Sequence, residues 1–105
     1  MIVAIVQHFV KSGMVERAEH RIKANGDRMA TTPGFLFRQA LVSSSDPQKL
    51  VTLTAWESRE HYESWLEGQR ADATGGASAS AEGTPYVRVE TEIFTVRRSD
   101  VGGQT

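Results

Sequence analysis

Three side chains in this sequence combine a reactive group with apolar neighbours. His8 lies in the segment IVAIVQHFV, where its imidazole could act as a general base near neutral pH. Arg38 lies in FLFRQALV, where a guanidinium could bind a carboxylate or a phenolate. Trp65 follows Tyr62 by about one helical turn, and its indole could form a wall that stacks on a flat substrate. These residues are the first candidates for a catalytic or binding site.

Each candidate also has a purely structural interpretation. A Trp on an amphipathic helix can be a core residue, and a strand His can be bonded to a neighbour inside the protein or lie in water. The strand Arg could instead pair with an acid across the sheet, such as Glu90 or Glu92. The Tyr62 hydroxyl could orient a substrate, and Trp56 could plug the end of a barrel, although packing is the favoured interpretation of both.

Composition excludes several kinds of site. The chain has no cysteine, which excludes disulfides, iron–sulfur centres and thiolate nucleophiles. The three His residues lack the spacing of metal ligands, so no metal site is predicted, and His20 and His61 are expected on solvated helix faces. Residues 72–84 are rich in Gly, Ala and Ser but contain no phosphate-binding pattern, and they predict a mobile loop or lid. No flavin or nicotinamide motif is present, so no organic cofactor is predicted.

Length and charge set the class of protein. At 105 residues the chain is expected to form one domain. A formal net charge of −1 argues against a nucleic-acid partner, because phosphate binding requires clustered Lys and Arg. The apolar N-terminal segment is too short to span a membrane and lacks the features of a signal peptide. A cytoplasmic location is therefore expected.

Six elements in the order βαββαβ must position these residues. β-Branched alternating segments predict strands, and apolar residues at helical spacing predict helices, with Ser58 capping the second helix. Ser12 or Gly13 is expected to cap the first helix, and Gly26 to end or bend it. The strands are predicted over Ile2–Val10, Phe35–Ser43, Lys49–Trp56 and Pro85–Val96, and the helices over Met14–Ala30 and Arg59–Ala73.

Both faces of the predicted strands are apolar. His8 shares one face with Val6 and Ala4, and on the second strand Arg38 is expected opposite Phe35. This pattern predicts a ferredoxin-like α+β domain with an antiparallel sheet and two helices on one face. A second copy of the chain is the simplest cover for the other face, which predicts a homodimer joined through the sheets. Val6 and Ile22 are expected to line a pocket between helices and sheet.

A set of short motifs carries a resemblance to a known family. They are Thr32-Pro33-Gly34-Phe35, Trp56-Glu57-Ser58 at the end of the third strand, and Tyr62 with Trp65-Leu66 in the second helix. In this order and spacing the chain resembles the antibiotic biosynthesis monooxygenase family, whose fold is a dimeric α+β barrel. The resemblance covers about residues 2–96 and defines the predicted domain 1–96, which leaves 97–105 as a predicted flexible tail.

The resemblance implies three chemistries: cofactor-free oxidation of polycyclic phenols and anthrones by O₂, haem degradation, and quinol metabolism. Haem-degrading members are expected to have a Trp and a ligating His on the second helix and an Asn on the first strand. Trp65 matches the Trp, but residues 70–76 hold no His, and the Asn position falls at Val6 or Gln7. The sequence therefore favours the cofactor-free oxidation of an aromatic molecule. In that reaction Trp65 stacks on the substrate, His8 or Arg38 stabilises its anion, and Tyr62 orients it. Haem degradation and a non-catalytic hydrophobic-ligand-binding dimer remain as alternatives.

Overall fold

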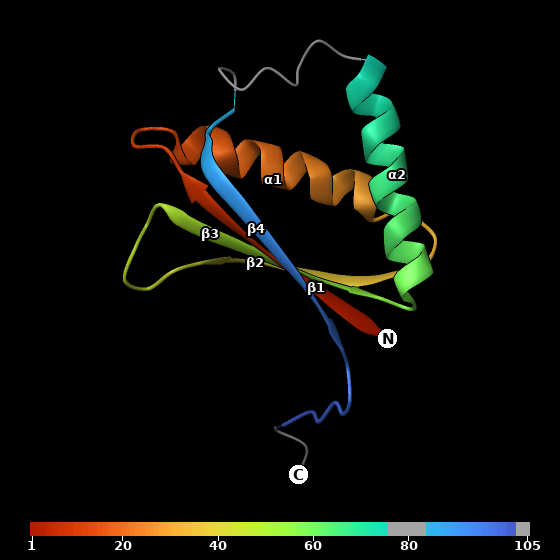
Figure 1. Cartoon of the computed structure of the whole chain (residues 1–105). Coiled ribbons are helices and arrows are strands. Elements are labelled where there is room, and N and C mark those ends of the chain that lie inside the picture. The colour runs from red at the N-terminus through yellow and green to blue at the C-terminus, as the bar shows by residue number, and fades with distance from the viewer. Residues whose placement is uncertain (76–83, 103–105) are drawn as a thin grey trace.

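The computed structural model describes residues 1–75 and 84–102. The elements are β1 (Ile2–Val10), α1 (Val15–Met29), β2 (Phe35–Val42), β3 (Lys49–Trp56), α2 (Arg59–Gly75) and β4 (Tyr86–Thr95). The predicted order βαββαβ is confirmed, and the bounds of β1 and β3 are the predicted ones. Figure 1 shows α1 and α2 above the sheet, with the N-terminus at the free end of β1.

The four strands form one antiparallel sheet in the order β2-β3-β1-β4. Every second residue of β1 and β3 is directed toward the helices, as the period of a strand requires. On β3 these residues are Leu50, Thr52, Thr54 and Trp56, and all four are buried. The predicted ferredoxin-like α+β fold is confirmed, and this face of the sheet is called the helix side below.

Two apolar clusters fix the helices on the helix side. One joins Ile2 and Ala4 of β1 to Met29 of α1, Trp56 of β3 and Tyr62 of α2. The other cluster joins the opposite end of β1 to the first turns of α1 through Val10, Ala18, Ile22 and Leu50. The clusters therefore lie at the two ends of β1, and α2 belongs to only one of them.

The helix ends differ from the predicted ones. α1 begins after Met14 with no side-chain cap, so the predicted cap by Ser12 or Gly13 is wrong. α1 continues through Gly26 as far as Met29, one residue short of the predicted Ala30, so Gly26 does not end the helix. α2 runs to Gly75, because the alanines of its last turns are good helix formers. The predicted mobile loop therefore begins too early, and 76–83 lie outside the described residues.

Two irregularities in strand pairing move residues between faces. The register of β2 shifts between Phe35 and Phe37, so Phe35 packs on the helix side while Phe37 pairs with Ala55 on the other face. Arg38 pairs with Thr54 and also lies on the helix side, so the prediction that Arg38 lies opposite Phe35 is wrong for this reason. The register of β4 shifts opposite Phe9 and Val10, which turns Tyr86 toward α1.

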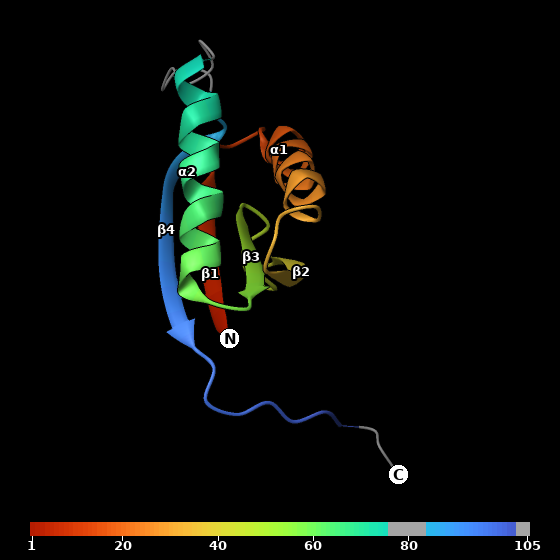
Figure 2. The same ribbon diagram turned by 90° about the vertical axis from the view of Figure 1, so that its right-hand side faces the viewer.

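The face away from the helices remains uncovered by the described residues. Phe37, Leu41 and Phe94 are 46%, 47% and 42% exposed on it, although large apolar side chains are favourable to bury. Figure 2 shows α1 above β2 and β3, and the residues after β4 leaving the sheet as an extended chain. No described helix has the length and apolar character needed to cross a membrane.

Candidate functional site

Trp56 forms the centre of an aromatic cluster at one end of the helix side. Its ring centroid lies 5.5 Å from Phe35, 5.7 Å from Tyr62 and 6.3 Å from Trp65. The indole of Trp56 is fully buried, and its Nε1 donates to Thr54 Oγ1 at 3.0 Å. A side chain with no accessible surface has nothing to offer a ligand, so we assign Trp56 to the core instead of the predicted substrate lining.

Tyr62 and Trp65 differ in exposure although both extend from α2 toward Trp56. Tyr62 is only 4% exposed, and burial raises the pKa of its phenol, which keeps the hydroxyl protonated. Trp65 is half-buried and packs against the edge of the same cluster. Unlike Tyr62, Trp65 is therefore both held in place by packing and partly accessible to a ligand.

His8 lies on the helix side near the other end of β1. Its cross-strand partners are Leu50 on β3 and Val89 on β4. The His8 Nδ1 lies 3.2 Å from the Leu50 carbonyl oxygen. Because a carbonyl only accepts hydrogen bonds, Nδ1 carries the proton and the neutral ring keeps its lone pair on Nε2. The imidazole also packs against Tyr86, with ring centroids 5.0 Å apart.

The surroundings of His8 favour its neutral form. Burial lowers the pKa of His8, the bond to the Leu50 carbonyl partly opposes this, and the positive charge of Arg38 lowers the pKa further. The guanidinium carbon of Arg21 lies 5.9 Å from the centroid of the Tyr86 ring that packs on His8. A neutral imidazole with an available Nε2 can act as a base or as a ligand.

Stability should depend on pH through His8. The unfolded chain titrates near the ordinary value of 6.5, whereas the folded pKa is lower, so between the two values only the unfolded chain binds the proton. The free energy of unfolding should therefore fall as the pH drops through 6.5, and the loss should stop below the folded pKa. Denaturant titrations above and below this pH measure the effect. His8→Gln should remove most of the change in the free energy of unfolding with pH. His20→Gln, at an exposed position of α1, should keep that change. If the free energy of unfolding varied with pH equally in both variants, His8 would not be its source.

Arg38 lies under α1, on the opposite side of β3 from His8. Its Nη2 donates to the Ile22 carbonyl oxygen at 2.6 Å, and its Nε is buried with no hydrogen-bond partner among the described residues. Burial lowers the pKa of Arg38 and the charge of Asp27 opposes this, but a guanidinium stays protonated at neutral pH. The suggested pairing with Glu90 or Glu92 is wrong, because β2 and β4 are opposite edges of the sheet.

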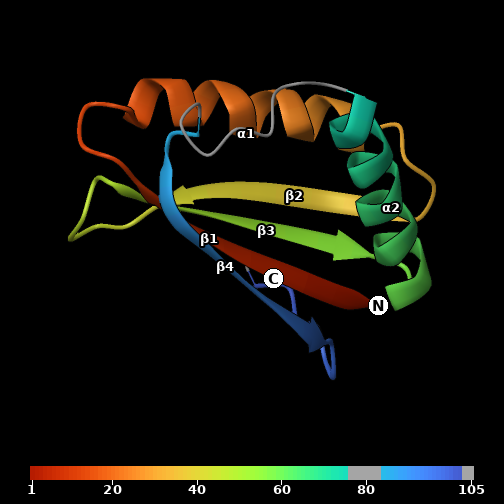
Figure 3. The ribbon, with the colours of Figure 1, turned by 45° about the horizontal axis from the view of Figure 1, so that its top comes forward.

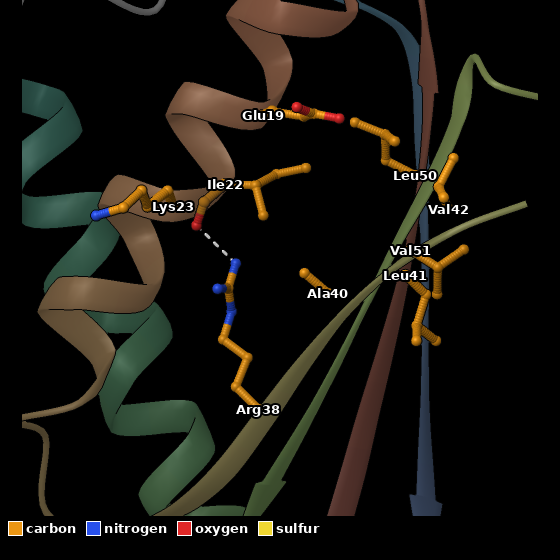
Figure 4. Close-up of a pocket in the computed structure, with 9 residues that line it drawn as sticks. All are labelled: Glu19, Ile22, Lys23, Arg38, Ala40, Leu41, Val42, Leu50 and Val51. Atoms are coloured by element: carbon orange, nitrogen blue, oxygen red, sulfur yellow. Dashed lines mark hydrogen bonds between the residues drawn. The ribbon is translucent and has the colours of Figure 1, made fainter.

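A cavity of about 360 Å³ opens beside Arg38, between α1 and the edge strand β2 (Figure 4). Ile22 and Leu50 form its apolar floor, and Glu19 and Lys23 stand at its rim. The guanidinium reaches α1 only because residue 26 is glycine: a Cβ there would overlap the Arg38 guanidinium. The signal for this contact in the sequence was a glycine inside an otherwise regular helical pattern.

The candidate residues thus fall into separate groups on the helix side. Arg38 and Ile22 line the cavity under α1, whereas His8 and Trp65 flank the β1–β4 half of the sheet. There Val6 is half-buried, Val89 is 47% exposed and Thr91 is exposed, and we call these three residues the uncovered patch. Figure 3 shows β2 and β3 between α1 and the β1–β4 half of the sheet, with α2 at one end of the strands. Within the described part of the chain, neither helix buries the patch.

The two ends of the uncovered patch are far apart. Trp65 packs in the cluster that contains Ala4, and His8 follows Ala4 by four residues on β1. A strand rises about 3.3 Å per residue, which separates these ends by about 13 Å. A single aromatic ring cannot reach both, so a ligand that contacts both ends must be considerably larger than one ring.

The remaining histidines and acidic side chains do not form a metal site in the part of the chain that the structure describes. No group of three or more His, Cys, Asp or Glu residues that could hold a metal ion occurs in residues 1–75 and 84–102. His20 is exposed as predicted, but His61 is half-buried, which corrects the prediction of a solvated face. The His61 Nδ1 lies 2.7 Å from Ser58 Oγ, and Ser58 Oγ accepts from the His61 amide, so the Ser58 cap is confirmed.

Residues 1–74 match the family model for the antibiotic biosynthesis monooxygenases. The chain belongs to this family. The match covers the elements from β1 to α2, which include the uncovered patch residue Val6 as well as His8 and Trp65. The resemblance drawn from the Pro-Gly-Phe, Trp-Glu-Ser and second-helix motifs is therefore confirmed.

Relatives of this monooxygenase-family chain include enzymes of two chemistries. It is 29% identical over 94 residues to a haem oxygenase (mycobilin-producing) of Mycobacterium tuberculosis, covering 90% of this chain and 86% of the relative. The solved structure of the haem degrader MhuD from M. tuberculosis, with two haems bound in its active site, is 26% identical with a TM-score of 0.76, covering 97% of this chain and all of that one. SnoaB, a cofactor-independent oxygenase from Streptomyces nogalater, is 20% identical with a TM-score of 0.72, covering 93% and 95%. The last of these likenesses shows the fold alone.

Proposed function

We propose that this family member is an oxygenase that binds haem on the helix side of its sheet and degrades it with O₂. The observation that carries the proposal is that His8 and the Trp65 cluster lie at opposite ends of the uncovered patch, four residues or about 13 Å apart along β1, a span that suits a macrocycle better than a single ring. The likeness to haem-degrading relatives at 29% and 26% identity supports the same choice. Haem degradation is thus placed ahead of cofactor-free oxidation, whereas the sequence favoured cofactor-free oxidation.

The residues present fit such a substrate. Trp65 offers an indole face for stacking at one end, and Val6 and Val89 offer an apolar floor. His8 offers a neutral nitrogen donor at the other end. Haem iron accepts an imidazole as axial ligand, and oxidation of the macrocycle by O₂ needs electrons from an external reductant. The protein's own part is to bind the macrocycle, fix its orientation and exclude water.

A haemin titration tests this function. The wild-type protein should give a saturable Soret shift, and ascorbate in air with catalase present should then bleach the Soret band enzymatically. Trp65→Ala should weaken haemin binding by about tenfold or more, because aromatic stacking is worth about 1–3 kcal/mol, whereas Trp65→Phe should recover part of the loss. His20→Gln serves as the matched control on α1. A flat titration of the wild-type protein would sink the proposal.

A second candidate is the cofactor-independent oxidation of a polycyclic phenol or anthrone by O₂. Residues 70–84 favour it, because they contain no His, Cys, Met or Tyr that could bind iron from the end of α2. In this reaction His8 Nε2 would accept the substrate proton. Oxygen uptake with a panel of anthrones and quinols, measured without haemin, distinguishes this function: turnover there and no haemin binding would favour it.

We also propose that two copies associate through the uncovered sheet face. Phe37→Glu should shift the protein from dimer toward monomer and weaken association by about tenfold to a hundredfold, because burying one large apolar side chain is worth about 1.5–3 kcal/mol. Sedimentation velocity over a concentration series measures this. Ala24→Glu adds the same charge at an exposed position of α1 and should leave the dimer intact. A wild-type protein that remains monomeric throughout the series would contradict the proposal.

A further inference from the structure

We propose that His8 binds the haem iron through Nε2, so that the axial ligand comes from β1 and not from α2. This inference rests on the proposed function, since it requires that haem occupies the uncovered patch. Among residues 1–69 and 84–102, whose side chains the structure describes, His8 is the histidine that adjoins that patch, where it pairs with Val89.

The hydrogen bond of the His8 ring is that of a typical metal ligand. Metal-binding imidazoles usually donate their second N–H to a carbonyl or carboxylate, which fixes the tautomer and the ring orientation. His8 already has this arrangement, with Nδ1 donating to the Leu50 carbonyl at 3.2 Å. Because the two ring nitrogens lie on opposite sides of the imidazole, Nε2 is directed away from the β3 backbone. The donor is therefore oriented before any ligand binds.

The position of His8 gives an iron atom access to Nε2. The side chain is half-buried, and two apolar residues of the uncovered patch adjoin it: Val89 across the strand pair and Val6 two residues earlier on the same face. Tyr86 covers one side of the ring. A macrocycle lying on the patch would bring its iron toward His8 while one edge extends toward Trp65.

The other potential donors are less suitable. Tyr86 is beside His8, but burial raises the pKa of its phenol, which disfavours the phenolate that iron binds. His61 is bonded to Ser58 through Nδ1 and packs against Gly34 at the far end of α2. His20 is exposed on α1 and carries no contact with the patch. One protein donor is sufficient, because the macrocycle supplies four nitrogens of its own.

Spectroscopy of His8 variants tests this ligand assignment without relying on turnover. In wild-type protein, haemin should give the absorption and electron paramagnetic resonance spectra of imidazole-ligated ferric haem. His8→Ala should lose that signature and weaken haemin binding by at least about tenfold, the lower end of what removing even a supporting partner of a metal ligand costs. Adding free imidazole to His8→Ala should restore the spectrum. His20→Gln and His61→Gln should bind haemin with the wild-type spectrum.

Metal-free protoporphyrin IX distinguishes binding of the macrocycle to the uncovered patch from ligation of its iron by His8. It occupies the same surface but has no iron to ligate, so wild-type and His8→Ala proteins should bind it equally, as measured by quenching of Trp fluorescence. If haemin binds to both proteins with the same spectrum, the His8 assignment is overturned and the proposed function stands. If neither haemin nor protoporphyrin binds to wild-type protein, the proposed function fails and the ligand assignment fails with it.

Discussion

Trp56→Ala should lower the free energy of unfolding by about 3–5 kcal/mol, the usual cost of removing a large buried aromatic side chain. Trp56 is fully buried and packs against three other aromatic rings, those of Phe35, Tyr62 and Trp65. Its removal leaves a cavity that these rings cannot easily fill. The substitution also leaves Thr54 Oγ1, itself buried, without its indole donor. Urea denaturation followed by circular dichroism, at several protein concentrations so that any dimer is accounted for, gives the number.

The comparison with Trp65 makes this prediction specific. Trp65→Ala removes a half-buried ring from the edge of the cluster and should cost clearly less stability than Trp56→Ala. Haemin binding should follow the opposite order at temperatures where both variants are folded. Trp56→Phe keeps an apolar ring in the core and should recover much of the stability. A loss below about 1 kcal/mol for Trp56→Ala would show that the cluster is not the main core.

Gly34→Ala should lower the free energy of unfolding by about 2–5 kcal/mol, because two penalties add. Gly34 has φ +84°, a conformation that costs an L-residue about 1–2 kcal/mol. A Cβ at this residue would also overlap the imidazole of His61, and such overpacking costs about 1–3 kcal/mol. The backbone cannot shift freely, since the Gly34 carbonyl accepts from the Glu57 amide at 2.8 Å. Thermal and urea unfolding measure the loss.

Two further variants separate these penalties. Gly68→Ala introduces the same methyl group at a helical position where, beyond the helix's own nearby backbone, no atom lies within 4 Å of the new Cβ. It should be neutral or stabilise the protein by about 0.5–1 kcal/mol, through the helix preference of Ala. Adding Gly34→Ala to a His61→Ala background removes the overlap and should leave only the cost of the backbone conformation. If Gly34→Ala were equally costly in both backgrounds, the packing of His61 on Gly34 would not contribute.

The site could be predicted only in part. That His8 and Val6 share the face beneath the helices follows from the alternation of β1, which has no irregularity before Phe9. That His8 and Trp65 flank one patch while Arg38 lies in a different cavity could not be predicted, because it depends on the strand order β2-β3-β1-β4. The burial of Trp56 and the bond between His61 and Ser58 likewise come from contacts between elements.

The sequence by itself determined the order of the elements, the bounds of β1 and β3, and the family, because strand and helix periodicities and short motifs are local properties. The tertiary structure alone decided the shifted registers that turn Phe35 and Tyr86 toward the helices, since a bulge depends on pairing with a distant strand. It also decided that Arg38 reaches the Ile22 carbonyl over Gly26, and that the His8 ring is fixed by Leu50, 42 residues away in the chain. These contacts are non-local, and the chain forms them only when the sheet and helices pack together.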